Sequence, residues 1–301
     1  MKLFAPKYYK DFACIKGDCK NSCCIGWEIE VDEATLEKYG TLPKFRRENI
    51  LKNLNSSDGR TVIATDVHGR CPFLTECGLC EIISTLGEEY TSVICRRHPR
   101  FYNFFTDRCE VGLGVSCEAA ARLVLSAGVC YELTEVGEIL PEGEASPKYT
   151  DEERSKIFAI ISEGDVGYEE KISSVLTEYG ISREVIREAY DSVFPELELL
   201  RSDSRELLTL DGQAPPEAYP YLLSFFAYLV YRHIPGSASY ENLRARVGFA
   251  VLLTEIMGAA AGKLSEVSLE VLCDIVAKIS EEIEYSEDNT EAIIFEIESI
   301  I

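Results

Sequence analysis

The chain has 301 residues, of which 46% are hydrophobic, so it can bury a sizeable core in one or two domains and is not a disordered tail. Its 30 Lys and Arg residues face 52 Asp and Glu residues, for a formal net charge of −22. A nucleic-acid-binding protein normally presents a basic patch, and the short segment Arg96–Arg100 is the nearest candidate, so the composition argues against a nucleic-acid partner.

The N-terminal part of the sequence predicts short strands and helices. Apolar and polar residues alternate over 27–31, which favours a strand, and Asp32 is placed to cap a helix that stops at Gly40. The other elements predicted here are a turn at 56–60, a strand at 61–64, two helical pieces within 81–95 that Gly87 separates, and a helix at 117–125.

The composition changes at 138–150, where Pro, Gly and Glu residues predict a linker. We therefore expect a Cys-rich metal-binding domain at 1–137 and an all-α domain at 138–301, which together make a mostly α protein. Thr150–Glu153 has the capping-box pattern of a helix start. One further helix is predicted to end at Gly180, and Ser182 is placed to cap the next one. More helices are predicted over 196–210, 220–234, 241–262, 266–284 and 290–300.

No segment of the sequence predicts export or membrane insertion. The first twelve residues lack the apolar run of a signal peptide. The most apolar run, 219–231, is too short to span a bilayer and predicts a buried core helix. We therefore expect a cytosolic protein without a membrane span, whose acidic surface serves solubility or attracts a cationic substrate.

Twelve cysteines carry the most specific information. Thiols are kept reduced in the cytosol, so dense clusters there indicate metal binding or catalysis more often than disulfides. Neighbouring residues such as Cys23 and Cys24 also rarely reach disulfide geometry with each other, and we expect their side chains to diverge. The cysteines are Cys14, Cys19, Cys23, Cys24, Cys71, Cys77, Cys80, Cys95, Cys109, Cys117, Cys130 and Cys273.

A metal site in this chain would consist mainly of thiolates, because the only histidines are His68, His98 and His233. Zinc favours paired C-x2-C turns, and Cys77–Cys80 fits that pattern. An iron–sulfur cluster accepts thiolates from scattered loops, which suits the remaining spacings. The residues alone favour an iron–sulfur centre and leave zinc, and disulfides or free thiols, as alternatives.

Three blocks of sequence carry a family resemblance. YYKDFACIKGDCKNSCCIGWEIEVDEATLEKY, CPFLTECGLCEIISTLGEEYTSVICRRHPRFYNFF and GLGVSCEAAARLVL, within residues 8–125, resemble the flagellin lysine-N-methylase family. That family shares its cysteine pattern with a broader group associated with zinc or iron chelation. The resemblance implies methyl transfer from S-adenosylmethionine to a lysine ε-amine, with flagellin as the protein substrate. It also implies an iron–sulfur centre of 4Fe-4S type, or zinc.

The resemblance further implies which thiols bind the metal. The eight matching positions are Cys14, Cys19, Cys23, Cys24, Cys71, Cys80, Cys95 and Cys117. The additional positions Cys77, Cys109, Cys130 and Cys273 are expected to be small buried apolar residues. Eight thiols exceed the four ligands of one cluster, so they imply either two metal sites or a supporting set of thiols.

The sequence does not identify a catalytic base or a pocket for S-adenosylmethionine. Gly112 and Gly114 form the nearest approach to a glycine-rich cofactor loop, and they favour a tight turn before Cys117. Trp27, the single tryptophan, is expected either to shield the metal or to pack in the core. A non-enzymatic metal-binding module and a redox protein therefore stay open as alternatives to a methyltransferase.

Overall fold

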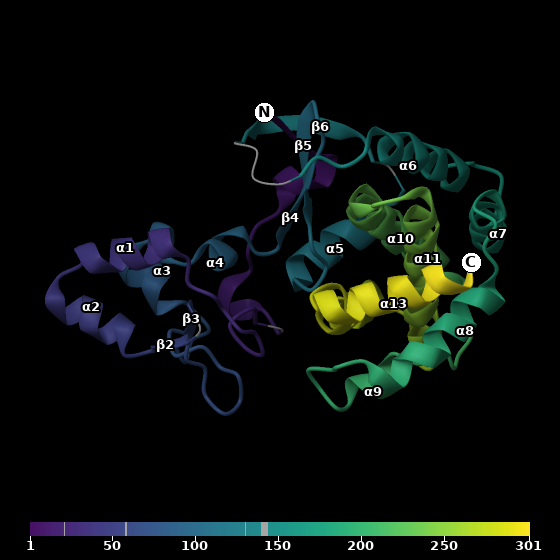
Figure 1. Cartoon of the computed structure of the whole chain (residues 1–301). Coiled ribbons are helices and arrows are strands. Elements are labelled where there is room, and N and C mark those ends of the chain that lie inside the picture. The colour runs from purple at the N-terminus through teal and green to yellow at the C-terminus, as the bar shows by residue number, and fades with distance from the viewer. Residues whose placement is uncertain (21, 58, 130, 140–143) are drawn as a thin grey trace. The chain divides into compact units, whose positions relative to one another are not determined.

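The computed structural model describes residues 1–20, 22–57, 59–129, 131–139 and 144–301 (Figure 1). The chain folds into two compact units. One consists of Ala13–Arg100 and is called the Cys-rich unit below; the other, Met1–Phe12 with Phe101–Ile301, is called the helical unit. The expected boundary between 137 and 138 lies inside the helical unit, because residues 1–12 and 101–138 pack with the helices.

The Cys-rich unit contains short elements, as predicted. Its elements are α1 (Glu33–Thr41), α2 (Lys44–Leu51), β2 (Leu54–Ser57), β3 (Arg60–Ile63), α3 (Glu81–Leu86) and α4 (Val93–Arg97), with single 3-10 turns at Lys16–Asp18 and Glu88–Tyr90. Asp32 caps α1, accepting a hydrogen bond from the Thr35 amide at 3.0 Å. Gly87 ends α3 in a left-handed conformation with φ of 109°, which explains the break predicted there.

The strand expected over 27–31 forms only in part. Glu30 makes an isolated antiparallel bridge with Val62 of β3, and Ile63 donates to the carbonyl of Ile29 at 2.9 Å. Ile29 and Val31 are both buried, as the alternating pattern requires. The segment is therefore extended and lies beside β3, but too few of its residues pair for a full strand.

The helical unit contains a four-stranded sheet that the sequence analysis did not predict. Its strands are β1 (Lys2–Pro6), β4 (Arg100–Phe104), β5 (Arg108–Leu113) and β6 (Leu133–Glu138), in the order β4-β5-β1-β6. β1 runs parallel to β5 and antiparallel to β6. These pairings join segments more than 100 residues apart, so no local pattern of residues indicates them.

Helices make up the rest of the helical unit, and the mostly α fold class is confirmed (Figure 1). The helices are α5 (Glu118–Ser126), α6 (Lys148–Ile161), α7 (Tyr168–Glu178), α8 (Arg183–Val193), α9 (Ser204–Leu207), α10 (Tyr219–His233), α11 (Tyr240–Gly262), α12 (Leu269–Ile279) and α13 (Glu287–Ile300). α10 and α11 pack against each other inside one apolar core. The prediction of a buried helix at 219–231 is confirmed.

α11 is long and apolar enough to cross a membrane by length and composition. In the described part of the chain it is the one helix with that length and composition, and 83% of its most apolar window is buried inside the protein. Its neighbours α10 and α13 supply that burial. α11 therefore occupies the environment of a core helix.

Two helix predictions in this unit are wrong for identifiable reasons. Instead of one helix over 196–210, the chain forms a short 3-10 turn and α9, because the buried carboxylate of Glu282 accepts hydrogen bonds from the Leu200 and Arg201 amides. The expected capping box at Thr150 is also absent, because α6 begins earlier, at Lys148. Asp151 instead pairs with Arg154 at 2.9 Å.

Candidate functional site

The structure distributes the eight expected ligand cysteines over both units. Cys14, Cys19, Cys23, Cys24, Cys71, Cys80 and Cys95 lie in the Cys-rich unit, and Cys117 lies in the helical unit as the N-cap residue of α5. Cys130, one of the four additional cysteines, lies outside the described residues. The candidate thiol site is therefore the one inside the Cys-rich unit.

Four of these cysteines gather at one apolar core. Cys71 is buried within it, and Cys24, Cys80 and Cys95 pack against it with Trp27. Each comes from a different segment: Cys71 donates its amide to the carbonyl of Cys24 at 2.8 Å, Cys80 precedes α3, and Cys95 lies in the first turn of α4. We call Cys24, Cys71, Cys80 and Cys95 the thiol cluster.

The thiol cluster is electrostatically coupled. Burial raises the pKa of Cys71 to about 12, and negative charge on Cys24, Cys80 and Cys95 raises it further. Burial likewise raises the pKa values of Cys80 and Cys95, and charge on Cys24 adds to both. Several thiolates so close together in an apolar setting repel one another, so a bound cation would favour the fully ionised set.

The prediction that the side chains of Cys23 and Cys24 diverge is wrong. The two thiols form a hydrogen bond, which lowers the pKa of Cys24 to about 7 and raises that of Cys23. Hydrogen bonding by Ser22 and the positive charge of Arg70 also favour the Cys24 thiolate. Cys24 is therefore the member of the thiol cluster that ionises most readily, and Cys23 is its immediate neighbour.

Glycine contacts bring the separate cysteine loops together. A Cβ at Gly17 would lie 2.5 Å from the carbonyl oxygen of Cys77, and a Cβ at Gly78, where φ is 74°, would lie 2.8 Å from the Gly17 Cα. The loop that holds Cys14 and Cys19 therefore packs backbone against backbone on the Cys77–Cys80 turn. Only glycine permits that approach at both positions.

The Cys77–Cys80 turn does not present its two thiols together. Cys77 is exposed, and its sulfur lies 3.1 Å from the Thr75 hydroxyl, a hydrogen bond that lowers the pKa of the Cys77 thiol. Cys80 packs against the apolar core instead. Of the additional cysteines, Cys109 and Cys273 are buried as expected, whereas the expectation of burial is wrong for Cys77.

The thiol cluster has the donor atoms that a soft metal prefers, but its side chains are not arranged around a metal position. Within the described residues, no three Cys, His, Asp or Glu side chains stand in position to hold a metal ion. The four sulfurs share one apolar core and influence one another's charge. Cysteine thiolates are the donors that zinc and iron–sulfur clusters take.

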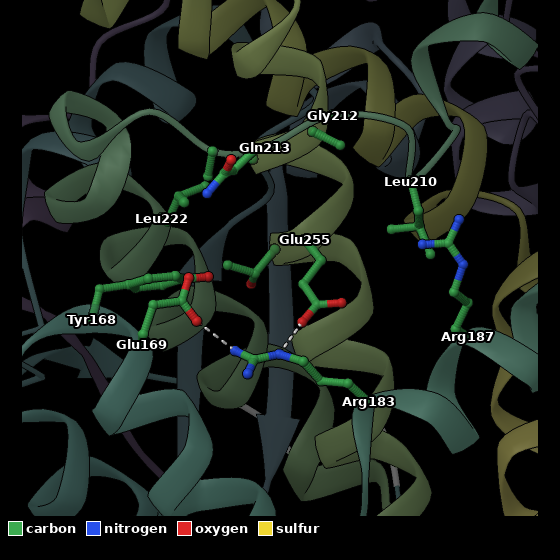
Figure 2. Close-up of a pocket in the computed structure, with 13 residues that line it drawn as sticks. Tyr168, Glu169, Arg183, Arg187, Leu210, Gly212, Gln213, Leu222 and Glu255 are labelled. Atoms are coloured by element: carbon green, nitrogen blue, oxygen red, sulfur yellow. Dashed lines mark hydrogen bonds and ion pairs between the residues drawn. The ribbon is translucent and has the colours of Figure 1, made fainter.

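A pocket in the helical unit was not predicted from the sequence (Figure 2). It has a volume of about 280 Å³ and is formed by α7, α8, α10, α11 and the loop before α10. Arg183 bridges two carboxylates at its edge, lying 2.6 Å from Glu255 and 2.9 Å from Glu169. Because its lining comes from segments up to 90 residues apart, no single motif marks it.

Two polar side chains, Tyr168 and Gln213, line this pocket. Tyr168 is about nine-tenths buried and stacks on Tyr219 with 5.0 Å between ring centroids. Gln213 is exposed and lies across the opening from Arg183 in Figure 2. Burial raises the pKa of Tyr168 well above its usual range, so the hydroxyl stays a donor.

Comparisons with known proteins place these features in a family. The chain is 30% identical over 128 residues to the flagellar biosynthetic protein FliU of Salmonella muenchen, covering 40% of this chain and 75% of that protein. It is 28% identical over 137 residues to the lysine-N-methylases of Salmonella typhimurium strain LT2 and Salmonella choleraesuis strain SC-B67, covering 43% of this chain. It spans 34%, about a third, of the length of those two methylases.

Two further comparisons gave no match. No family model matches the chain, and no solved structure resembles it significantly. The relatives agree with the resemblance carried by the cysteine blocks, and three quarters of FliU is covered at 30% identity. The chain therefore belongs to the family of FliU and the lysine-N-methylases, the flagellin lysine-N-methylase family.

Proposed function

We propose that the protein is a lysine N-methyltransferase that transfers a methyl group from S-adenosylmethionine to a lysine ε-amine of a flagellin-type protein. The observation that carries this proposal is its similarity to two proteins named lysine-N-methylase and to one named for flagellar biosynthesis. The proposal places the protein in the cytosol, where S-adenosylmethionine is made and thiols stay reduced.

The thiol cluster supports the second part of the proposal, a thiolate-bound metal centre. Cys24, Cys71, Cys80 and Cys95 supply the four thiolates that one [4Fe-4S] cluster or one zinc ion takes. Cys14, Cys19, Cys23 and Cys117 would then be supporting thiols or ligands of a second site. The metal would hold the four segments together, since the Cys-rich unit has only a small core of its own.

Methyl transfer requires a neutral lysine amine and an in-line arrangement of the two reacting atoms. The bond between the amine nitrogen and the methyl carbon forms as the methyl–sulfonium bond breaks, which leaves S-adenosylhomocysteine. The lysine must first lose a proton, because only the neutral amine has a lone pair, and a desolvating pocket or a nearby base lowers its pKa. In-line positioning of the two reacting atoms supplies much of the acceleration.

The test has two readouts on one anaerobic preparation of the full chain. Elemental analysis decides between iron with sulfide and zinc, and incubation with methyl-labelled S-adenosylmethionine and flagellin decides whether lysine acquires label. Flagellin whose lysines have been acetylated is the matched control acceptor. Label on native flagellin and none on the acetylated protein is the expected result.

The rival function is a metal-binding or redox module without transferase activity. The observation that favours it is the limited extent of the match, which covers about a third of the lysine-N-methylases. The same experiment separates the two: stoichiometric metal without transfer to any lysine-bearing acceptor supports the module and contradicts the methyltransferase proposal.

A further inference from the structure

The pocket of the helical unit is lined by charged groups of both signs. Arg183 uses Oε1 of Glu255 and Oε2 of Glu169, which leaves the second oxygen of each carboxylate able to accept from a ligand. Glu255 is the deeper of the two, with its side chain only 25% exposed, against 59% for Glu169. An ammonium group at this edge would find two acceptor oxygens.

Arg187, one helical turn after Arg183 on α8, supplies a positive charge to the pocket. Arg187 lies 3.8 Å from Asp191 and 3.7 Å from Asp211, distances beyond hydrogen-bond range, and its side chain is 54% exposed. Its guanidinium donors are thus available to a carboxylate, which arginine binds through two parallel hydrogen bonds. Figure 2 shows Arg187 on the Leu210 side of the pocket and Glu169 on the Tyr168 side.

The other residues that line the pocket can contact the uncharged part of a ligand. The hydroxyl of Tyr168 and the side-chain amide of Gln213 line the pocket and can hydrogen-bond to a ligand. Leu210, Ala214, Leu222 and Ala259 supply apolar walls. The volume, about 280 Å³, lies just below the range of about 300–1,000 Å³ typical of pockets for larger ligands, so an amino-acid-sized group fits.

We infer that this pocket binds an α-amino-acid headgroup, with its ammonium at Glu255 and Glu169 and its carboxylate at Arg187. Two sources share that chemistry: a free amino acid, and S-adenosylmethionine, which carries the headgroup on its sulfonium. S-adenosylmethionine as the source rests on the proposed function. The headgroup specificity itself rests on the pocket alone.

The test measures binding by isothermal titration calorimetry on the full chain with three probes. S-adenosylhomocysteine has nucleoside and headgroup, 5′-methylthioadenosine has the nucleoside without the headgroup, and L-methionine has the headgroup without the nucleoside. We expect S-adenosylhomocysteine to bind at least tenfold more tightly than 5′-methylthioadenosine, because the latter lacks both charged contacts.

Variants assign that difference to the pocket. Arg187→Gln should weaken S-adenosylhomocysteine binding about tenfold or more and leave 5′-methylthioadenosine unaffected, and Tyr168→Phe should weaken it less because the stacked ring is kept. Arg122→Gln is the matched control, since Arg122 is exposed on α5 and does not line the pocket. Glu255→Gln tests the ammonium contact, and thermal unfolding checks that it folds without the full Arg183 ion pair.

The outcomes separate this inference from the proposed function. Binding of L-methionine but not of S-adenosylhomocysteine supports the headgroup site and assigns it to a free amino acid, which removes this pocket from the methyl-transfer reaction. Binding of S-adenosylhomocysteine that Arg187→Gln and Glu255→Gln leave unchanged overturns the inference while the methyltransferase proposal stands. Absence of binding for all three probes also overturns it.

Discussion

At the scale of single residues, the thiols differ more than their spacing indicates. Cys77 and Cys80 belong to one C-x2-C turn, yet one is exposed and the other packs in the core. Cys23 and Cys24 are adjacent, yet they share a hydrogen bond. Spacing brings these thiols together in the sequence, but the backbone conformation decides which sulfurs meet.

Alanine substitutions within the thiol cluster should each remove metal from the protein. We expect Cys24→Ala, Cys71→Ala, Cys80→Ala and Cys95→Ala to retain less than half of the wild-type metal, because three thiolates hold a cluster or zinc poorly. Elemental analysis and visible absorbance after anaerobic purification measure this. Cys273→Ala and Cys109→Ala, which also shorten a buried cysteine, should keep the full complement. Equal metal in all variants would contradict the assignment.

Glu284 is a buried charged residue of the helical unit. Its carboxylate lies 2.7 Å from His233 Nε2 and 3.4 Å from Arg232. Burial alone would raise its pKa, but Arg232 and His233 outweigh burial and lower the pKa to about 2. Burial lowers the pKa of His233 as well, so Arg232 is the partner that we regard as keeping Glu284 ionised.

The consequence is a defined pH dependence of stability. Because the folded-state pKa is below the unfolded value of 4.5, the stabilisation is complete above pH 4.5 and is lost as the pH falls towards 2. Glu284→Gln should lower the free energy of unfolding at pH 7 by about 3 kcal/mol, and this deficit should shrink as the pH falls. Urea unfolding from pH 7 to pH 2 measures it, with the exposed Glu163→Gln as control. A deficit that is independent of pH would contradict the ionised state.

At the scale of elements, Asp32 joins two helices of the Cys-rich unit. Oδ1 accepts from the Thr35 amide at the start of α1, and Oδ2 accepts from the Val93 amide at the start of α4 at 2.8 Å. α4 carries Cys95, whose own amide lies 3.4 Å from the Ser92 hydroxyl. A residue predicted only as a helix cap therefore also positions one member of the thiol cluster.

Asp32→Ala should accordingly cost more than the loss of one helix cap. We expect the unfolding free energy of the Cys-rich unit to fall by about 2–3 kcal/mol, since a cap is worth about 1 kcal/mol and the Val93 amide loses its partner too. Trp27 fluorescence during urea unfolding measures the change. Glu37→Ala, an exposed substitution in the same helix, should change it by less than about 0.5 kcal/mol. A cost no larger than that of this control would contradict the dual role.

The helices and strands that the sequence predicts correctly are those set by residues close together in the chain. Caps at Asp32 and Ser182 and the break at Gly87 act within a few residues, and the structure has all three. The sheet of β1, β4, β5 and β6 depends on partners across the chain, and so does the pocket around Glu255. The irregular segment before α9 depends on Glu282, about 80 residues away. Such long-range causes leave no local pattern.

At the scale of the whole molecule, charge and chemistry are unevenly divided. Residues 13–100 contain 12 Lys and Arg against 13 Asp and Glu, a net charge of −1, so the remaining residues hold −21 of the −22. Each unit also has a separate apolar core. The acidic balance seen in the composition therefore belongs to the helical unit, and the thiol cluster lies in a nearly neutral one.

Two separate cores predict two separable unfolding transitions. Trp27, the single tryptophan, lies in the Cys-rich unit, whereas most helical residues lie in the other unit. Trp27 fluorescence and far-ultraviolet circular dichroism should therefore report different midpoints in urea. Removing the metal with a chelator should lower the fluorescence midpoint and leave the dichroism midpoint nearly unchanged. Coincident midpoints that both shift would contradict independent units.

The mass of flagellin is the most direct measure of methyl transfer to lysine. Flagellin is incubated with S-adenosylmethionine and the anaerobically purified full chain, and intact-protein and peptide mass spectrometry then locate any added methyl groups. We expect wild-type protein to add methyl groups to flagellin lysines, and reactions without S-adenosylmethionine to add none. Unmodified flagellin in the presence of a metal-loaded, folded protein would contradict it.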